Sequence, residues 1–340
     1  MNLTVKRSDA SYEIAIGKGL LAKAGKHFDL DRKVLVVTDD GIPRLYVQAI
    51  LAECKEPTLV TIPKGDKNKT LATYETILKV ALAADLTRSD AVLALGGGMV
   101  CDLAGFVAAT YLRGIDFYSV PTTLLAMADA SVGGKTGLNF EGYKNQVGAF
   151  YQPSGVLIDP ELLATLDRRQ LACGYAEILK MALTLDADLF YRMEDGSAPM
   201  EELIRRAVEL KASVVGSDER EGNLRRVLNF GHTVGHAIES TLRGAWLHGE
   251  CVALGMIPMC SEKLQKRVLP LLTQHGLPVR YEGDPASVIE TIVRDKKRQG
   301  DAITVVFVNE PGSYELKKIP LALFKKEIAK APIFEQGERT

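Results

Sequence analysis

Three short apolar runs constrain the fold more than any other feature of this sequence. Residues 33–37 (KVLVV) are typical of a strand that is buried on both faces, 58–62 (TLVTI) of a second strand, and 91–95 (AVLAL) of a third, buried strand. The segments between them, 43–53 and 70–84, carry apolar residues at helical spacing. This alternation predicts an α/β domain with a doubly wound, mainly parallel, Rossmann-like sheet.

The third run ends in a turn that suits a bound phosphate. Gly96, Gly97 and Gly98 separate it from helix-like residues 101–112. Glycines at such a turn let a ligand approach the backbone, and a helix N-terminus favours negative charge. The stretch is not GxGxxG, so the standard dinucleotide fingerprint is absent, and a tight turn also uses glycine for steric reasons alone. Asp39, after the first run, is either a ribose ligand or a turn residue.

The second half of the chain is richer in helical periodicity. The change follows Pro153 and Pro160 and places a domain boundary near 155–165, so we expect an α/β domain over 1–160 and a mostly α-helical domain over 161–340. Short strands are expected at 2–6 and 12–16, as a hairpin, and at 302–308. Helices are expected at 161–165, 168–183, 186–193, 200–215, 230–241, 248–265 and 285–296.

A short segment, residues 228–250 (LNFGHTVGHAIESTLRGAWLHGE), holds three of the five histidines. His232 and His236 are four residues apart and share a helix face, and His248 follows in a His-Gly-Glu turn. Three histidines among several glycines favour a metal site over core or surface histidines, although the spacing does not say which of them bind. Glu177 lies on an otherwise apolar helix, three residues before Lys180, and a metal would give this carboxylate a partner.

Residues 129–145 contain further candidates for anion binding. The sequence GGKTG (133–137) is only partly like a phosphate loop, because Asp129 stands where the first glycine belongs. We expect Lys135, Lys144 and Asn145 to lie on glycine-rich loops. Their side chains suit an anionic substrate, but solvated loop lysines are the plainer explanation.

Composition narrows the classes of function. The 42 Lys and Arg residues nearly balance 43 Asp and Glu, and a net charge of −1 argues against nucleic-acid partners and polybasic membrane binding. We find no apolar run long enough to span a membrane, and the N-terminus MNLTVKRSD lacks the apolar core of a signal peptide, so a cytoplasmic location is expected. Five cysteines without a CxxC pair are expected to be reduced and mostly buried.

Long motifs make the chain resemble the 3-dehydroquinate synthase family of sugar phosphate cyclases, which is structurally akin to the glycerol dehydrogenase group. The resemblance covers nearly the whole chain and implies a dehydroquinate synthase-like fold. The motifs are LGGGMVCDLAGFVAATYLRG, VPTTLLAMADASVGGKTGLN, YKNQVGAFYQP, GYAEILK, KASVVGSDEREGNLRRVLNFGHTVGHAIE and LHGE.

The resemblance implies an NAD- and metal-dependent carbon–oxygen lyase of the shikimate pathway, which supplies chorismate and the aromatic amino acids. It would convert 3-deoxy-D-arabino-heptulosonate 7-phosphate to 3-dehydroquinate and phosphate. The steps would be transient oxidation by NAD, phosphate elimination, re-reduction and intramolecular aldol closure. The alternatives are a cyclase that makes an inosose or a valiolone, a metal-dependent polyol dehydrogenase, and a catalytically silent binding or scaffold protein.

The resemblance also implies roles for individual residues. One Zn²⁺ or Co²⁺ would be held by Glu177, His232 and His248, and His236 would contact the substrate. The expected NAD-binding residues are Asp39, Asp66, Lys69, Gly97, Gly98, Asp102, Thr122, Thr123, Lys135, Lys144 and Thr165. The expected substrate-binding residues are Arg113, Lys135, Asn145, Lys180, Lys211, Arg225, Asn229, His236 and one of Lys296 and Lys297. Catalytic roles would fall to Asp129, Lys135, His236, Lys180, Arg225 and Asn229.

The resemblance further implies a homodimer in which Arg113 reaches the active site of the neighbouring subunit. Three positions depart from the family pattern. Asp66 stands where the family has the longer Glu, Cys101 replaces Gly within GGGxxGD, and Tyr143 replaces Gly before the Lys-Asn pair. We expect changes in cofactor contact, helix packing and loop geometry, respectively.

Overall fold

The chain forms two compact units. A computed structural model describes residues 1–6, 11–218, 224–242, 244–297 and 301–334, with backbone alone at residue 6 and at 295–297. One unit comprises Met1–Asp167 and Lys211–Gly216, and the other comprises Arg168–Leu210 and Ser217–Thr340. The break after Asp167 lies beyond the region where prolines placed the boundary. The assignment of NAD to the first domain and of metal to the second stays a prediction.

A seven-stranded sheet forms the centre of the first unit, in the order β1-β2-β9-β6-β5-β3-β4. All neighbouring strands are parallel except the antiparallel pair β1–β2, which confirms the mainly parallel sheet and the pairing expected at the N-terminus. The strands are β1 (Asn2–Lys6), β2 (Ser11–Ile16), β3 (Lys33–Asp39), β4 (Glu56–Ile62), β5 (Ala91–Gly96), β6 (Asp116–Pro121) and β9 (Gly155–Ile158).

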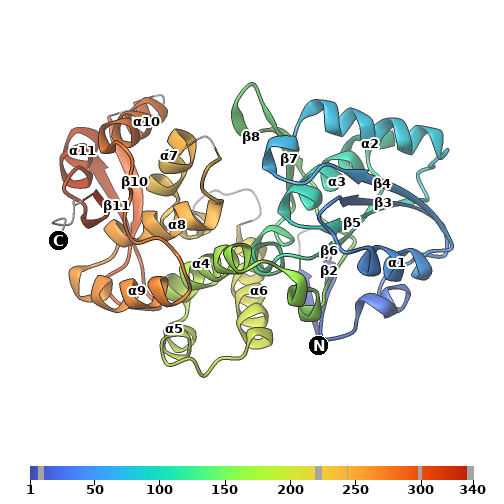
Figure 1. Cartoon of the computed structure of the whole chain (residues 1–340), viewed down its shortest axis with the longest axis horizontal. Coiled ribbons are helices and arrows are strands. Elements are labelled where there is room, and N and C mark those ends of the chain that lie inside the picture. The colour runs from blue at the N-terminus through green and yellow to red at the C-terminus, as the bar shows by residue number, and fades with distance from the viewer. Residues whose placement is uncertain (7–10, 219–223, 243, 298–300, 335–340) are drawn as a thin grey trace. The chain divides into compact units, whose positions relative to one another are not determined.

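Helices cover both faces of this sheet. Helix α1 (Arg44–Glu53) lies on one face, and α2 (Leu71–Ala83) and α3 (Gly98–Thr110) lie on the other (Figure 1). Leu35 and Val37 of β3 share a buried apolar cluster with residues of α2 and α3. The alternate residues of β3 are also buried. Coverage of both faces of the sheet therefore explains why strand β3 is continuously apolar over residues 34–37.

The expectation of glycine-rich loops around Lys135 and Lys144 is wrong. Both lysines lie on an antiparallel pair, β7 (Lys135–Phe140) and β8 (Tyr143–Phe150). Gly137 and Gly148 face each other across this pair, and a Cβ atom on Gly148 would lie 2.0 Å from the carbonyl oxygen of Thr136. The glycines are therefore required for close approach of two strands rather than for a loose loop.

The second unit is mostly helical, as expected. Its helices are α4 (Arg168–Leu185), α5 (Ala187–Glu194), the first part of α6 (Met200–Ser217), α7 (His232–Leu242), α8 (His248–Met256), α9 (Glu262–Gln274), α10 (Pro285–Lys297) and α11 (Leu321–Ile328). A two-stranded antiparallel sheet joins β10 (Ala302–Phe307) and β11 (Glu315–Pro320).

The single helix expected over 248–265 is wrong. Helix α8 ends at Met256, a short 3₁₀-helix containing Pro258 follows, and Ser261 caps the separate helix α9. Proline lacks the amide hydrogen that a continuing helix needs and disfavours helical backbone before it. Ser261 accepts a hydrogen bond from the amide of Leu264 and so begins a new helix.

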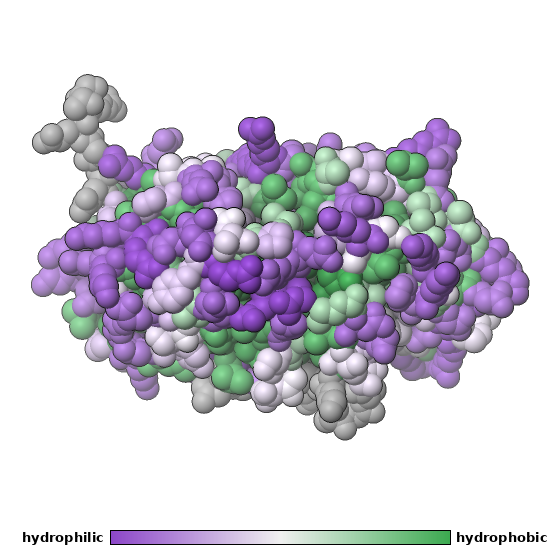
Figure 2. Space-filling model, turned by 90° about the horizontal axis from the view of Figure 1, so that it is seen from below, coloured by the Kyte–Doolittle hydropathy of each residue, from purple (hydrophilic) through white to green (hydrophobic). Residues whose placement is uncertain are grey.

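The helices and the cysteines agree with two expectations from the sequence, which were the lack of a membrane-spanning run and the burial of reduced cysteines. Among the described residues, no helix combines the length and the apolar character needed to cross a bilayer. On the face seen in Figure 2, hydrophilic side chains alternate with smaller hydrophobic areas. All five cysteines are described, buried and free of disulfides, which confirms that expectation.

Candidate active site

Glycines bring three helices of the second unit together at backbone distance. A Cβ atom on Gly255 of α8 would lie 1.9 Å from the carbonyl oxygen of Gly231, just before α7. A Cβ atom on Gly249 of α8 would lie 2.4 Å from the Cα atom of Cys173 on α4. No larger residue fits at either position. This packing places His232 and His248, the first residues of α7 and α8, beside Glu177 of α4.

Two ring nitrogens approach one oxygen of Glu177. The Nε2 atom of His232 lies 3.8 Å from Oε1, and the Nε2 atom of His248 lies 3.4 Å from it. The Nδ1 atom of His232 lies 3.0 Å from the carbonyl oxygen of Phe230. A carbonyl oxygen only accepts, so Nδ1 carries the hydrogen and Nε2 keeps its lone pair for a ligand.

His236 belongs to the same cluster. One nitrogen from each of His232, His236 and His248 lies within 4.8 Å of the other two, although His236 is exposed and the other rings are partly buried. The geometry therefore accommodates either a three-histidine set or Glu177 with two histidines. The ligand set Glu177, His232 and His248 stays a prediction.

Glu177 is a buried carboxylate that suits a cation. It is 1% exposed, and the Nζ atom of Lys180 lies 2.5 Å from its Oε2 atom. Burial alone would raise the pKa of Glu177, but Lys180 and the two neighbouring histidines hold this pKa well below its usual range. Neither carboxylate oxygen makes a hydrogen bond of normal geometry with the described residues. A divalent ion bound by Glu177 and two imidazoles fits this arrangement.

The two partly buried histidines differ in charge. Burial and the ammonium of Lys180 hold the pKa of His232 well below its usual value, so this ring is neutral, as a ligand must be. Burial also lowers the pKa of His248, but Glu177 and Glu239 outweigh it and raise the pKa to about 10. A divalent ion would take the place of the proton on Nε2 of His248.

Other predicted substrate residues of the second unit differ in exposure. Arg225 lies in the 3₁₀-helix Leu224–Asn229 and is 2% exposed, whereas Asn229 is exposed. The backbone amide of Arg225 donates to Oδ2 of Asp218 over 3.0 Å. Lys180 and Arg225 thus give this unit two buried cations. The side chains of Lys296 and Lys297 lie outside the described residues.

In the first unit, the turn after β5 has the form expected for a phosphate site. Gly97 caps α3, and the amide of Thr122 donates to the carbonyl oxygen of Gly96 over 2.9 Å. The first amides of α3, beginning at Gly98, have no partner within the helix. The Thr122 hydroxyl is buried and has no hydrogen-bond partner among the described residues. Thr123 uses its hydroxyl to accept from the amide of Ala126. These groups fit a pyrophosphate.

Asp39 and Thr165, two other predicted cofactor residues, make local contacts. Asp39 accepts a hydrogen bond from the amide of Gly41 over 2.8 Å, as a turn residue does. Burial raises the pKa of Asp39. The Thr165 hydroxyl lies 3.4 Å from the hydroxyl of Tyr46. These contacts leave both explanations of Asp39 open.

Lys69 contacts both Asp102, which is expected to bind NAD, and Asn145, which is expected to bind the substrate. Its side chain is 4% exposed, and its ammonium contacts the carboxylate of Asp102 and the amide oxygen of Asn145. Burial raises the pKa of Asp102, and the charge of Lys69 opposes this effect. Asn145 has a φ angle of 54°, in the left-handed region. Lys69 thus holds Asn145 at a strained position of β8.

Asp66, which stands where the family has the longer Glu, contacts the β7–β8 pair. Its Oδ2 atom lies 3.1 Å from Nζ of Lys144 and 3.2 Å from Nδ2 of Asn139. Asp66 and Lys144, which are both expected to bind NAD, therefore form an ion pair with each other. Tyr143 begins β8 with an exposed side chain, so the strand forms despite its bulk.

Asp129 and Lys211 form a further ion pair in the first unit. Asp129 lies on the π-helix Ala126–Ala130, a rare conformation that is frequent at functional sites. The Nζ atom of Lys211 is 2.9 Å from Oδ1 of Asp129 and also donates to its carbonyl oxygen. Lys135 and Arg113 are exposed, and Arg113 has a φ angle of 68°.

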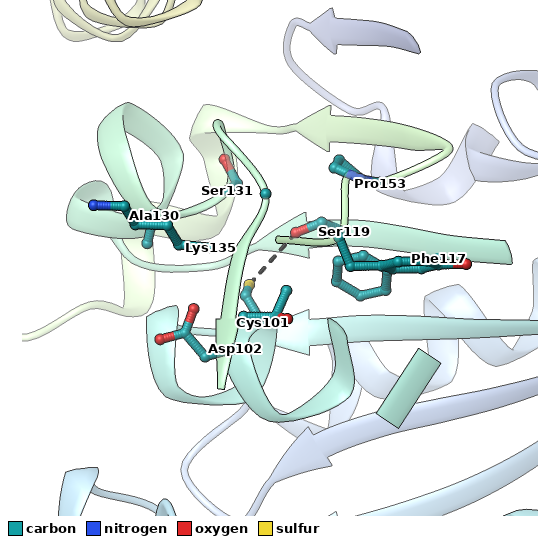
Figure 3. Close-up of a pocket in the computed structure, with 11 residues that line it drawn as sticks. Cys101, Asp102, Phe117, Ser119, Ala130, Ser131, Lys135 and Pro153 are labelled. Atoms are coloured by element: carbon teal, nitrogen blue, oxygen red, sulfur yellow. Dashed lines mark hydrogen bonds between the residues drawn. The ribbon is translucent and has the colours of Figure 1, made fainter. Parts of the chain in front are cut away.

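A small pocket of the first unit lies next to Asp129, because Ala130 and Ser131 are among the residues that line it. Asp102, Ser131 and Lys135 are among the residues that line it (Figure 3). Cys101, the residue that departs from the family pattern, lies 3.4 Å from the hydroxyl of Ser119, and burial raises its pKa to about 12. Ser131 was not among the predicted site residues, and its buried hydroxyl has no hydrogen-bond partner among the described residues.

Two family models together match most of the chain. Residues 59–173 match the model described as 3-dehydroquinate synthase N-terminal, and residues 174–298 match the one described as 3-dehydroquinate synthase C-terminal. The chain is also 39% identical over 348 residues to the 3-dehydroquinate synthase of Latilactobacillus sakei subsp. sakei (strain 23K). That alignment covers 96% of this chain and 97% of the relative.

Solved structures of other cyclases are similar in fold. A 2-deoxy-scyllo-inosose synthase complexed with carbaglucose-6-phosphate, NAD⁺ and Co²⁺ has a TM-score of 0.87 and 26% identity, with 97% of this chain and 100% of that chain covered. The 2-epi-5-epi-valiolone synthase of Streptomyces hygroscopicus subsp. jinggangensis 5008, with NAD⁺ and Zn²⁺ bound, has a TM-score of 0.86 and 30% identity, with 95% and 96% covered.

Proposed function

Because the chain belongs to the 3-dehydroquinate synthase family, we propose that it converts 3-deoxy-D-arabino-heptulosonate 7-phosphate to 3-dehydroquinate and phosphate. The reaction is redox-neutral overall and eliminates phosphate, which makes the protein a carbon–oxygen lyase. The structural observation that carries the proposal is the approach of two imidazole nitrogens to the buried Glu177 carboxylate. The second unit also buries the cations Lys180 and Arg225, as an anionic substrate requires.

Glu177, His232 and His248 would hold one divalent ion, Zn²⁺ or Co²⁺, the ions present in the two similar cyclase structures. The turn at Gly97 and the buried hydroxyl of Thr122 would hold NAD. When bound, NAD accepts and returns a hydride, and the ion acidifies a hydroxyl and polarises a carbonyl.

The side chains of the chain itself would bind and orient the substrate. Arg225 can bind phosphate or carboxylate through two parallel hydrogen bonds, and Lys180 adds a point charge. Cations that face a departing phosphate stabilise the charge that develops on it. His236 is exposed and can exchange a proton with a substrate hydroxyl. On the first unit, Lys211, which pairs with Asp129, and the exposed Lys135 remain predicted substrate contacts.

The proposal includes a homodimer in the cytoplasm, with Arg113 completing the site of the neighbouring subunit. The family membership and the position of Arg113 support it. Arg113 is exposed on the first unit, in a left-handed conformation that fixes the direction of the chain around it.

A substrate panel tests the reaction. The protein, with NAD and Zn²⁺, is given the heptulosonate phosphate, a heptulose phosphate or a hexose phosphate, and the products are identified by mass spectrometry. We expect 3-dehydroquinate from the first compound and no product from the others. A carbocycle formed only from a heptulose or a hexose phosphate would reassign the chain to another cyclase. An oxidised, still phosphorylated product would indicate a polyol dehydrogenase.

A further inference from the structure

Glu239 is a buried carboxylate for which the proposed reaction provides no role. It is 5% exposed and lies on α7, seven residues after His232 and three after His236, so all three side chains share one face of the helix. Its Oε2 atom lies 3.2 Å from the Nδ1 atom of His248, across the contact between α7 and α8.

This contact determines how the ring of His248 is held. An ionised carboxylate only accepts hydrogen bonds, so Nδ1 of His248 carries the hydrogen. The Nε2 atom at the other side of the ring lies 3.4 Å from Glu177. The imidazole is therefore fixed between two carboxylates from different helices, with Nε2 directed at Glu177.

The two histidines expected to bind metal are oriented by different means. His232 donates from Nδ1 to the carbonyl oxygen of Phe230, a backbone group that no side-chain substitution removes. His248 depends on a side chain. Its own side chain is 33% exposed, compared with 13% for His232, so the surroundings restrict its rotation less. The orientation of His248 therefore depends more strongly on its hydrogen-bond partner.

We propose that Glu239 is a positioning residue that fixes the orientation and tautomer of His248 and thereby sets the affinity of the site for a divalent ion. The inference rests on the proposed metal site. A carboxylate behind a metal-binding imidazole makes the ligand more basic and fixes its direction, and its loss typically lowers metal affinity about 10- to 100-fold.

Cobalt binding to the full chain tests the proposal without reference to activity. The affinity for Co²⁺ is measured by competition with a chelator, and the visible absorption spectrum reports the ligand field of the bound ion. Glu239→Gln keeps the shape and an accepting oxygen but removes the charge, whereas Glu239→Ala removes the contact. Glu202→Gln is the matched control, because it makes the same chemical change in the same unit at a carboxylate paired with Arg192.

We expect about 10-fold weaker binding for Glu239→Gln and about 100-fold weaker binding for Glu239→Ala, both with an altered cobalt spectrum. The control should match wild type in both measurements. Unchanged affinity, or weaker binding with an unchanged spectrum, overturns the role of Glu239. If Glu239→Ala shows no cooperative unfolding transition, the Gln variant alone decides. A wild-type chain that binds no cobalt overturns the metal site itself, and the inference with it.

Discussion

At the residue scale, the two histidines nearest to Glu177 and the exposed His236 have different expected roles. We predict that His248→Ala loses metal and activity together, because one of three ligands is removed. We predict that His236→Ala keeps the metal and loses most of its activity, because the exposed ring serves the substrate. Metal content after dialysis and turnover are measured on both variants. Loss of metal from His236→Ala, with retention in His248→Ala, would contradict the ligand assignment.

Spacing alone could predict only part of this site. Three histidines in one segment indicated a metal, but they did not indicate that a fourth group, Glu177, would approach from another helix. A carboxylate on an otherwise apolar helix made Glu177 a candidate partner for a metal, and the resemblance then assigned it as a ligand. Glu239 was not predicted, although its spacing from His232 and His236 places it on their face of the helix. The helical period of the histidines, extended to carboxylates, includes Glu239.

The buried thiols should be unreactive in the folded protein. Burial raises the pKa of Cys54 to about 11 and that of Cys101 and Cys173 to about 12, from an ordinary value of 9.0. A thiol with a pKa of about 11 is only about one-thousandth thiolate at pH 8, and the thiolate is the reactive form. We predict negligible alkylation by iodoacetamide at pH 8 and complete alkylation in denaturant, as read by mass spectrometry. Rapid alkylation of the folded chain at Cys54 would contradict these pKa shifts.

The same shifts predict how stability depends on alkaline pH. Above about pH 9 the unfolded chain loses thiol protons that the folded chain still holds, so the unfolded state is favoured. The free energy of unfolding should therefore fall as the pH rises from 9 towards 12. Replacing Cys101 by Ser should weaken this dependence. Denaturant titrations at several pH values provide the measurement, and an equal slope in the variant would count against the explanation.

At the scale of elements, the β7–β8 pair depends on two glycines. A Cβ atom at Gly148 would meet the carbonyl oxygen of Thr136 at 2.0 Å, so Gly148→Ala must separate the strands. We predict a loss of about 1–3 kcal/mol in the free energy of unfolding, together with weaker NAD binding, because Lys144, an expected NAD contact, lies on β8.

Gly17→Ala is the matched control, since a Cβ atom there would have only ordinary contacts, the nearest at 3.7 Å from Leu20. Denaturant unfolding and NAD titration are compared for the two variants and the wild type. A Gly148→Ala variant as stable as Gly17→Ala would show that the strands are not closely packed.

The predictability of each element follows from its local signal. Strands β3 and β5 were evident because both of their faces are buried. Strand β4, at the edge of the sheet, buries only Val60 and Ile62 but kept a short run typical of a strand. Thr70, the first residue of the helix expected over 70–84, caps α2 by accepting from the amide of Thr73. The pair β7–β8 was missed because its glycines suggested a loop and most of β8 is exposed. Strand β9 has four residues, too few for a clear pattern.

At the scale of the whole molecule, the proposed homodimer predicts complementation between inactive variants. Arg113→Ala and His248→Ala should each be inactive or nearly so. If Arg113 completes the neighbouring site, a mixed dimer contains one intact site. Random exchange of subunits after mixing should then restore about a quarter of wild-type activity. Activity is followed after unfolding and refolding the variants together, with each variant refolded alone as the control. No recovery would contradict a site shared between subunits.

In the proposed reaction, NAD is consumed and regenerated within each catalytic cycle while phosphate is eliminated. The most direct measurement is the number of phosphate molecules released for each NAD supplied, with absorbance of NADH recorded at the same time. The protein is given excess 3-deoxy-D-arabino-heptulosonate 7-phosphate, Zn²⁺ and NAD equal to the number of active sites. We expect many phosphates per NAD and no accumulation of NADH. Phosphate release that stops at one per NAD, or NADH that accumulates in step with substrate loss, would contradict it.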